Sequence, residues 1–533
     1  MTRVHGRQLR WNCGAVRRVF KLTTLQAGAE GFEPPHTDPE SAVLPLDEAP
    51  VRADFTIAAE GCLWKNNPSD CANLTPRVGC ITLGGTQIAM AYSVNETHDP
   101  QLKCWVESAH ARETDFPVQN LPFGVFTRRG RDASPRVGVA IGGQILDVST
   151  CLREALFDGF AVVAAEACAS PVLNDLLALG RDYWSALRRQ VSALLRVDSP
   201  AYRSDPRLGG RILIPMAEAD LLLPIAIGDY TDFYASVFHA TNVGRMLRPD
   251  NPLLPNYKYV PIGYHGRASS VVVSGTPVRR PNGQTKRDDA EPPTFGPSQR
   301  LDYELEVACV IGPGNALGEA ISIAEAEEHI FGVCLLNDWS ARDVQRWEYQ
   351  PLGPFLAKSF ATTISPWIVT MEALAPFRCA AFTRPEGDPA PLPYLDSPED
   401  QARGGLDLTL EVYLRSQQMR ERGIELMRLS RGNFRDMYWT LAQMVTHHAS
   451  NGCNLRPGDL LASGTVSGEA KDARGCLLEL TWGGKEPLEL PNGETRRFLL
   501  DGDEVILRGY CEREGYARIG FGECRGEVLA AQS

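Results

Sequence analysis

Three acidic side chains occur in stretches that otherwise have the composition of a protein core. In Arg300-Leu-Asp-Tyr-Glu-Leu-Glu-Val, apolar residues alternate with acids, which is the period-two pattern of a half-buried strand. Glu304 and Glu306 then share one strand face, roughly 6–7 Å apart, and repel each other unless a cation or water lies between them. Asp338 ends an apolar run that begins at Phe331, where an unpaired ion would be costly to bury. These acids predict a buried counter-ion.

The same residues allow two simpler interpretations. A Glu-x-Glu strand is also typical of a solvated sheet face, and Asp338 could cap a helix that begins at Trp339. If an ion is bound, its ligands are oxygens, and no paired His or Cys stands nearby. That ligand set favours Ca²⁺ or Mg²⁺ over zinc.

The segment from Ile227 to Asn242 adds a candidate proton acceptor. It holds Asp232, Tyr234 and His239 within eight positions. Aspartate could supply a fourth oxygen ligand, and histidine is the side chain whose ordinary pKa suits proton transfer near neutral pH. A histidine between Phe238 and Ala240 is also typical of a satisfied core residue, so both interpretations stay open.

A group of hydrogen-bond donors follows Asp338. Arg342, Gln345, Tyr349 and Lys358 lie in an aromatic, proline-bearing stretch, where a lysine could oppose developing negative charge or merely extend to the surface. The segment Gly464-Thr-Val-Ser-Gly has Val466 where a nucleophilic serine would be needed, so any hydrolysis would use water as the nucleophile.

Composition excludes several classes of protein. The 533 residues are 43% hydrophobic, enough for a large core and more than one domain, and the formal net charge of −12 argues against a nucleic-acid or anionic-membrane binder. We find no apolar stretch near the roughly 18 residues of a membrane span. The 14 cysteines include no C-x-x-C pair, so they predict neither a zinc site nor a disulfide framework, and a cytoplasmic location fits best.

The chain divides into three parts. Residues 1–107 show little periodicity and predict a poorly defined extension, either disordered or an artefact of the gene model. The first 29 residues are basic and contain no acid, which leaves a mitochondrial transit peptide as an alternative. Residues 108–223 predict a small α+β domain with a hairpin at 136–148 and a helix over 172–196. Residues 224–530 predict a large strand-rich domain with one clear helix over 434–448.

Six segments resemble the fumarylacetoacetase family. They are Gly228-Asp-Tyr-Thr-Asp-Phe-Tyr, His239-Ala-Thr-Asn-Val-Gly, Gly263-Tyr-His-Gly-Arg-Ala-Ser-Ser, Leu336-Asn-Asp-Trp-Ser-Ala-Arg-Asp, Lys358-Ser-Phe and Gly458-Asp-Leu-Leu-Ala-Ser-Gly-Thr. The resemblance runs from about residue 110 to residue 530. It implies an α+β, mainly β fold: a small Src-homology-3-like β-barrel followed by a large mixed β-sandwich-roll catalytic domain. It also implies a homodimer.

The resemblance further implies an activity and a role for each site residue. The family splits 4-fumarylacetoacetate, a small diketo acid, with water into fumarate and acetoacetate, the last step of tyrosine and phenylalanine catabolism. The implied ligands are Asp232, Glu304, Glu306 and Asp338 for a catalytic Ca²⁺, and Asp338, the main-chain oxygen of Lys358, and Thr362 for Mg²⁺. The implied general base is His239, oriented by Glu479 in a predicted strand, and the residues that stabilise the leaving enolate are Arg342, Gln345 and Lys358. The implied substrate-binding residues are Tyr234, Arg248, Tyr264, Gln345, Tyr349 and Thr465.

Several alternatives stay open at this stage. Asp302 and Asp343 are expected to be structural or to support the ligands. Ala361 stands where the family has a glycine, which would strain the second metal site if that position needs a positive φ. A related activity, acylpyruvate hydrolysis or oxaloacetate decarboxylation, is the enzymatic alternative. A non-catalytic β-protein that binds Ca²⁺ for structure is the other.

Overall fold

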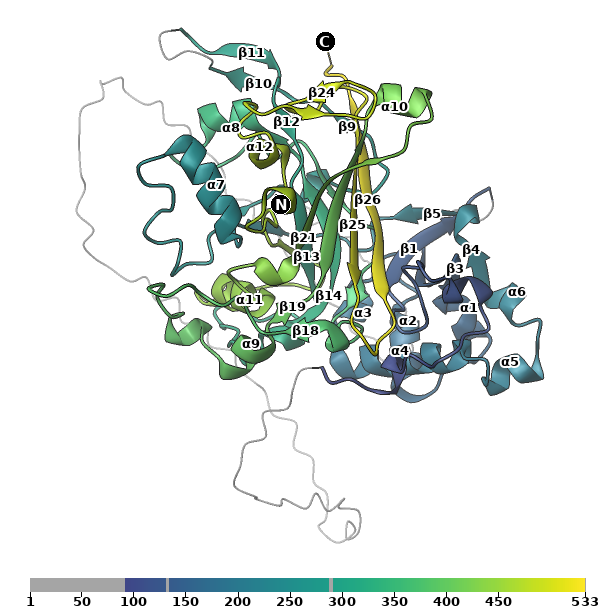
Figure 1. The fold of residues 1–533 in the computed structure, drawn as a ribbon. Coiled ribbons are helices and arrows are strands. Elements are labelled where there is room, and N and C mark those ends of the chain that lie inside the picture. Colours follow the sequence, from purple (N-terminus) through teal and green to yellow (C-terminus); the bar gives the residue numbers. More distant parts are fainter. Residues whose placement is uncertain (1–91, 131–133, 287–290, 533) are drawn as a thin grey trace, which may run out of the picture. The chain divides into compact units, whose positions relative to one another are not determined.

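The computed structural model describes residues 92–130, 134–286 and 291–532 (Figure 1). Most of the extension predicted over 1–107 lies outside these residues, as does the basic stretch. Its last part, however, is folded: the Tyr92 side chain is buried, and Cys104 forms a β-bridge with Arg196. Residues 92–107 therefore belong to the folded unit, and the predicted boundary at residue 107 is too late. In the described chain, no helix is both long and apolar enough to cross a membrane.

The N-terminal portion is built on a five-stranded antiparallel sheet in the order β4-β3-β2-β1-β5. Its strands are β1 (Phe123–Arg128), β2 (Arg136–Ile141), β3 (Gln144–Asp147), β4 (Leu213–Pro215) and β5 (Ala219–Leu222). The hairpin predicted at 136–148 is confirmed, since β2 pairs with β3 across a turn in which Gly142 has a φ of 53°, although Val148 already belongs to α1. The strand order is an open path from β4 to β5, so the closed barrel stays a prediction.

Six α-helices lie among the described residues of this portion. They are α1 (Val148–Arg153), α2 (Gly159–Ala167), α3 (Asn174–Leu177), α4 (Arg181–Leu195), α5 (Pro200–Ser204) and α6 (Gly209–Ile212). The prediction of a single helix over 172–196 is wrong, because the helical conformation is interrupted between α3 and α4. Gly180, the residue directly before α4, adopts a φ of 88° there, a conformation that glycine tolerates and that lies outside the helical range.

The second portion contains an eight-stranded mixed sheet. Its strands, in the order β7-β6-β22-β13-β14-β16-β8 with β17 also paired to β14, are β6 (Tyr230–Phe233), β7 (Gly263–His265), β8 (Val271–Val273), β13 (Leu305–Ile311), β14 (Ile330–Asp338), β16 (Thr362–Ile364), β17 (Val369–Thr370) and β22 (Leu460–Ala462). Every residue of β13 and β14 is buried. Alternate residues of β13 enter different cores: Val307 and Cys309 the larger one, Ala308 and Val310 the one shared with α3 and α4.

A five-stranded sheet packs against this central sheet. Its order is β21-β20-β25-β26-β9, with β9 (Val278–Arg279), β20 (Thr409–Arg415), β21 (Met427–Asn433), β25 (Glu504–Cys511) and β26 (Ile519–Leu529). Figure 1 shows the long strands β25 and β26, which pack against β14. The side chains of Leu410 and Leu507 share the larger core with that of Leu335. The mainly β prediction is therefore confirmed.

Short pairs of strands and helices complete the second portion. The pairs are β10 (Asn282–Thr285) with β11 (Thr294–Pro297), β12 (Leu301–Asp302) with β15 (Ser340–Ala341), β18 (Arg378–Cys379) with β19 (Gly405–Leu406), and β23 (Leu488–Glu489) with β24 (Thr495–Arg496). The helices are α7 (Val237–Leu247), α8 (Arg342–Glu348), α9 (Pro398–Arg403), α10 (Gln417–Glu421), α11 (Leu441–Ala449) and α12 (Leu477–Leu480).

Three predicted elements are wrong in this portion. The strand over 300–307 is interrupted between β12 and β13, and the helix over 434–448 is a 3₁₀ turn, Phe434–Asp436, followed by α11. The strand predicted around Glu479 is the helical turn α12, because the Asp302 carboxylate accepts hydrogen bonds from the backbone N–H groups of Leu477 (2.8 Å) and Leu478 (3.0 Å). These N–H groups have no partner inside the helix, so a carboxylate at its N-terminus stabilises it.

Candidate active site

Neighbouring strands of the central sheet bring four carboxylates together. Asp232 lies in β6, Glu306 in β13 and Asp338 at the end of β14, while Glu304 directly precedes β13. One carboxylate oxygen from each lies within 4.8 Å of the others, and all four residues are buried. The interpretation of the Glu-x-Glu stretch as a solvated sheet face is therefore wrong. The capping interpretation is wrong too, since β14 extends through Asp338 and no helix begins at Trp339.

Backbone contacts hold Glu304 in place outside the regular strand. Its N–H donates to the side-chain oxygen of Asn337 at 3.1 Å, and its carbonyl accepts from the N–H of Asp338 at 3.2 Å. Glu304, which lies between β12 and β13, is thus hydrogen-bonded to β14, the strand that also carries Asp338. Two of the four carboxylates are positioned relative to each other by backbone contacts.

One carboxylate of this cluster, that of Glu306, is not satisfied by hydrogen bonds within the described residues. Both oxygens of Glu306 are buried and have no hydrogen-bond partner among the described residues. Burial, and then the charges of Asp232 and Asp338, raises the pKa of Glu306, and burial followed by the charge of Asp338 raises that of Asp232. A site that favours a proton on its carboxylates also favours a cation in the proton's place. Four convergent, buried carboxylates therefore fit a hard divalent ion.

Two basic side chains adjoin the cluster. The Lys358 ammonium contacts a carboxylate oxygen of Glu304 and lies 2.6 Å from Oδ2 of Asp338. The guanidinium of Arg342 lies 2.8 Å from Oε1 of Glu304 and 2.9 Å from Oδ2 of Asp302. Burial alone would raise the pKa of Glu304, but the charges of Lys358 and Arg342 more than offset it and lower the pKa. Two fixed cations only partly balance four carboxylates, which leaves excess negative charge for an added cation.

His239 lies in the first turn of α7 and connects the cluster to Glu479. Its backbone N–H donates to the hydroxyl of the N-cap residue Ser236 at 3.2 Å, and its ring atom Nδ1 lies 2.6 Å from Oε2 of Glu479 in α12. Figure 1 shows α7 and α12 on the same side of the central sheet. The second ring nitrogen, Nε2, lies 3.8 Å from Oε1 of Glu304. An ionised Glu479 makes Nδ1 the donor, which leaves Nε2 as the proton acceptor facing the carboxylate cluster.

Glu479 is held as an anion by several donors. Asn242 donates to its Oε1 at 2.8 Å, and Ser467 and Cys476 donate to Oε2 at 2.7 and 3.2 Å. Burial would raise the pKa of this carboxyl, but the charge of His239 and the hydrogen bonds lower it to about 2. The site residues predicted from the sequence do not include Asn242, Ser467 and Cys476. Only Asn242 carried a signal, because it lies one helical turn after His239.

Four more of the predicted residues contact this centre directly. Tyr264 donates its hydroxyl to Oδ2 of Asp338 at 2.8 Å, and Thr362 donates to Oδ1 at 3.0 Å. The oxygen of Gln345 accepts from the Arg342 guanidinium at 3.1 Å. The Tyr234 ring stands edge-on to the His239 ring, with centroids 5.3 Å apart.

The remaining predicted residues are connected less directly. Burial raises the pKa of Tyr234, and the nearby positive charge of Arg248 opposes that rise. Thr465 is buried next to Gly464, whose N–H donates to Oδ1 of Asp232 at 3.1 Å. Tyr349 follows α8 and is half-buried; in the described chain its side chain makes no hydrogen bond to another predicted site residue.

Ala361 does not strain the backbone beside Thr362. Among the described non-glycine residues, φ is positive at Leu121, Ala155 and Trp482, and Ala361 is not one of them. Asp343 accepts from the Ser298 hydroxyl at 2.6 Å and from the N–H of Gln299 at 2.7 Å, which is a structural role.

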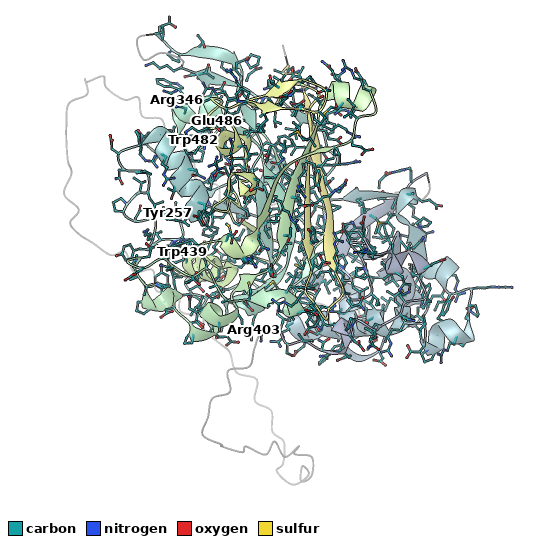
Figure 2. All side chains as sticks on the ribbon, in the orientation of Figure 1. Tyr257, Arg346, Arg403, Trp439, Trp482 and Glu486 are labelled. Carbon is teal, nitrogen blue, oxygen red and sulfur yellow. The ribbon has the colours of Figure 1, made fainter. Side chains whose placement is uncertain are left out.

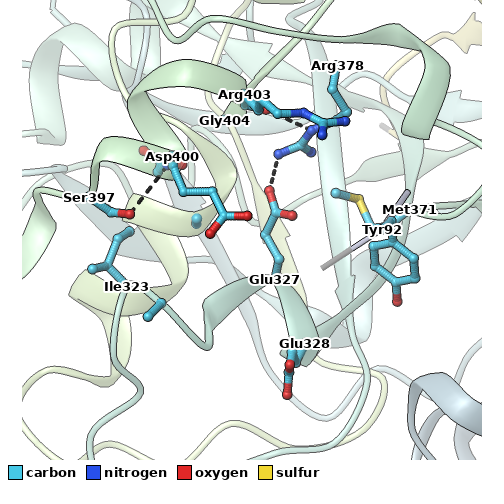
Figure 3. Close-up of a pocket in the computed structure, with 13 residues that line it drawn as sticks. Tyr92, Ile323, Glu327, Glu328, Met371, Arg378, Ser397, Asp400, Arg403 and Gly404 are labelled. Carbon is cyan, nitrogen blue, oxygen red and sulfur yellow. Dashed lines mark hydrogen bonds and ion pairs between the residues drawn. The ribbon is translucent and has the colours of Figure 1, made fainter. Parts of the chain in front are cut away.

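A separate small cavity of about 50 Å³ is lined by none of the predicted site residues (Figure 3). Its lining includes Tyr92, Glu327, Arg378 and Asp400, and Glu327 pairs with Arg378. Asp400 accepts from the Thr440 hydroxyl at 2.9 and 3.1 Å, so its carboxyl links α9 to the start of α11.

Comparison with known proteins adds independent information. Residues 230–529 match the sequence model described as fumarylacetoacetate (FAA) hydrolase C-terminal, and residues 119–224 match that described as fumarylacetoacetase N-terminal. The chain is 53% identical over 425 residues to the fumarylacetoacetase of Bos taurus and 53% identical over 423 residues to that of Homo sapiens. It is 51% identical over 424 residues to that of Caenorhabditis elegans, and each alignment covers 79% of this chain and 98% of the relative. The chain belongs to the fumarylacetoacetate hydrolase family.

Proposed function

We propose that this chain is a fumarylacetoacetase that hydrolyses 4-fumarylacetoacetate to fumarate and acetoacetate. The observation that carries the proposal is the buried His239–Glu479 pair, whose free Nε2 lies 3.8 Å from Glu304 of a four-carboxylate cluster. The named relatives cover the chain over both matched regions and support the same reaction. The family resemblance supports three further parts of the proposal: a homodimer, a cytoplasmic location, and a place at the end of tyrosine and phenylalanine breakdown.

The acidic cluster is the proposed cation site. Asp232, Glu304, Glu306 and Asp338 would hold Ca²⁺, and the unpartnered carboxylate of Glu306 supports this assignment. Asp338, the Lys358 main-chain oxygen and Thr362 would adjoin a second ion, Mg²⁺, since Thr362 already contacts Asp338. When bound, a divalent ion polarises the carbonyl of a diketone that is attacked by water.

His239 and Glu479 supply the proton transfer in this proposal. Nε2 of His239 takes a proton from the attacking water, a contribution of typically ~10²–10⁴-fold. The Glu479 carboxylate, 2.6 Å from Nδ1, stabilises the imidazolium that forms. The new C–O bond forms at the ketone carbon of the fumaroyl group, which becomes a carboxylate of fumarate. The C–C bond then breaks, and the electron pair goes to acetoacetate as its enolate, which takes up a proton at carbon.

Fixed positive charge is placed where the enolate develops. The Lys358 ammonium and the Arg342 guanidinium both contact Glu304, and Gln345 accepts from Arg342. Preorganised cations in a buried site stabilise developing negative charge without reorganisation, and removing one such group commonly costs roughly 10²–10³-fold in rate.

The substrate's carboxylates and carbonyls are assigned to polar residues around the cluster. Arg248 suits a terminal carboxylate, because a guanidinium binds a carboxylate through two parallel hydrogen bonds. The residues proposed to hold the rest of the substrate are Tyr234, Tyr264, Gln345, Tyr349 and Thr465.

The test is a direct assay on the purified chain. Loss of the ultraviolet band of fumarylacetoacetate is followed with Ca²⁺, with Mg²⁺ and with chelator, and the products are identified by NMR. Equimolar fumarate and acetoacetate, formed only with metal, are the expected result. Faster turnover of an acylpyruvate or of oxaloacetate would favour the related activity. No turnover of any of the three, with metal bound, would favour a non-catalytic Ca²⁺-binding protein.

A further inference from the structure

Residues 249–262 connect two of the proposed substrate-binding side chains. Helix α7 ends before Arg248, whose N–H donates to the Gly244 carbonyl at 2.6 Å, and β7 begins at Gly263, directly before Tyr264. The segment has no helix or strand of its own. The positions of Arg248 and Tyr264 therefore depend on how firmly the intervening residues are held.

The inner side of the segment is fixed to the site. A side chain at Gly244 would lie 1.8 Å from the Pro252 carbonyl, so only glycine allows the segment to fold back this closely on α7. The Tyr257 side chain is 2% exposed, and its hydroxyl donates to the carbonyl of Tyr234 at 2.8 Å. The Tyr234 N–H donates in turn to the Ile262 carbonyl, also at 2.8 Å.

The outer side of the segment is attached to a second loop, residues 380–392. The Lys258 ammonium contacts the carboxylate of Asp388, whose other oxygen accepts from the Tyr438 hydroxyl at 3.1 Å. The Arg384 guanidinium donates to the Lys258 carbonyl at 3.1 Å and to the Pro389 carbonyl at 2.7 Å. It also lies over the rings of Tyr438 and Trp439, 4.3 and 4.5 Å from their centroids. Figure 2 places Tyr257 and Trp439 on the same flank of the molecule as α7.

These contacts form a chain that leads from the second loop to the general base. The ring of Tyr438 lies 6.0 Å from that of Tyr257, which lies 6.0 Å from that of Tyr234, and the latter packs against His239. The Asp388 side chain is 7% exposed and the Lys258 side chain 35% exposed. The pair is therefore partly buried, with the Lys258 ammonium nearer to solvent than the Asp388 carboxylate. Its local effect is to join two loops that are 130 residues apart in sequence.

We propose that Lys258, Asp388 and Arg384 are positioning residues for substrate binding: they hold residues 249–262 so that Arg248 and Tyr264 are placed for the substrate before it arrives. The inference deepens the proposed function and rests on it for the roles of Arg248 and Tyr264. A segment ordered in advance costs less conformational entropy on binding, so the contacts affect substrate affinity rather than the chemical step.

The test compares Lys258→Met, Asp388→Asn and the double variant with the parent chain. Lys258→Met keeps the apolar stem, and Asp388→Asn keeps an acceptor for Tyr438. We expect KM to rise about fivefold, equivalent to ~1 kcal/mol, with kcat within about twofold of the parent. The KM of the double variant should not exceed the higher of the two single-variant KM values, because the two side chains act as a pair. Lys103→Met, at an exposed lysine in the N-terminal portion, is the control and should change neither constant.

Hydrogen exchange of the free protein supplies a readout that is independent of turnover. Peptides covering 249–262 should exchange faster in Lys258→Met and Asp388→Asn, and peptides of α11 should not. Unchanged exchange, or faster exchange with an unchanged KM, would overturn the proposal, as would a loss of kcat alone. If the parent chain did not turn over the diketone, the proposed function would fail, while the exchange data would still show whether the pair orders the segment.

Discussion

Glu479→Gln removes the negative charge beside His239 with little change in shape. Four donors converge on the two carboxylate oxygens, three of them on Oε2. A glutamine can turn its oxygen toward His239, Ser467 and Cys476 and its amide NH₂ toward Asn242, which can rotate its own amide to accept. The variant therefore isolates the loss of charge.

The size of the effect follows from the pKa of Glu479. That pKa is about 2 instead of the ordinary 4.5, and the difference corresponds to ~3 kcal/mol. The Coulombic attraction of His239 is the largest of the interactions that lower it, and the same attraction stabilises the imidazolium in return. If the transition state carries most of the positive charge on His239, kcat falls about 100-fold.

The assay is the loss of the fumarylacetoacetate ultraviolet band at saturating metal, measured across pH. Glu489→Gln, at an exposed glutamate in β23, is the matched control and should behave as the parent. Circular dichroism and thermal unfolding show whether the variant is folded. A folded Glu479→Gln protein with kcat within about threefold of the parent would refute the role of this charge.

Three further predictions concern Lys358, Arg248 and Asp400. Lys358→Met removes an ammonium that contacts Glu304 and Asp338. The variant should bind Ca²⁺ more tightly in calorimetry and hydrolyse the substrate roughly 100-fold more slowly. Weaker Ca²⁺ binding would contradict this prediction. Arg248→Lys should raise KM about tenfold in steady-state kinetics with little change in kcat, because a lysine cannot form paired hydrogen bonds to a carboxylate. Burial raises the pKa of Asp400 from 3.8 to about 6, so its carboxyl favours folding when protonated, and that stability is lost as pH rises through about 6. Asp400→Asn should therefore raise the free energy of unfolding at pH 7.5 by up to ~3 kcal/mol, with less than half of the gain left at pH 4.5 in urea titrations.

Much of the proposed metal site could be predicted from single stretches of sequence. Acids inside apolar runs are rare enough that Glu306 and Asp338 pointed to a shared ion, and the structure brings their carboxylates together with those of Asp232 and Glu304. The alternation that indicated Glu304 also led to the wrong prediction of one continuous strand over 300–307, because a period-two pattern does not show where a strand is interrupted.

The partner of the proposed general base could not be derived from local pattern. His239 and Glu479 are 240 residues apart, and the short apolar stretch around Glu479 has the composition of a strand. It forms a helical turn because Asp302, itself 175 residues away, accepts from the Leu477 N–H. Contacts between distant segments decide both features, and the family resemblance supplied the Glu479 role that the local sequence did not.

The most direct test of the central claim is the dependence of turnover on occupancy of the carboxylate cluster. Metal-free protein is titrated with Ca²⁺ and then with Mg²⁺, while bound metal and the rate of fumarate formation are measured in the same samples, for the parent chain and for Glu306→Gln. We expect the rate to rise in proportion to one bound ion, and Glu306→Gln to lose both the ion and the rate, because both Glu306 oxygens are buried without another partner in the described chain. Full turnover by metal-free protein, or by Glu306→Gln with no ion bound, would contradict the account.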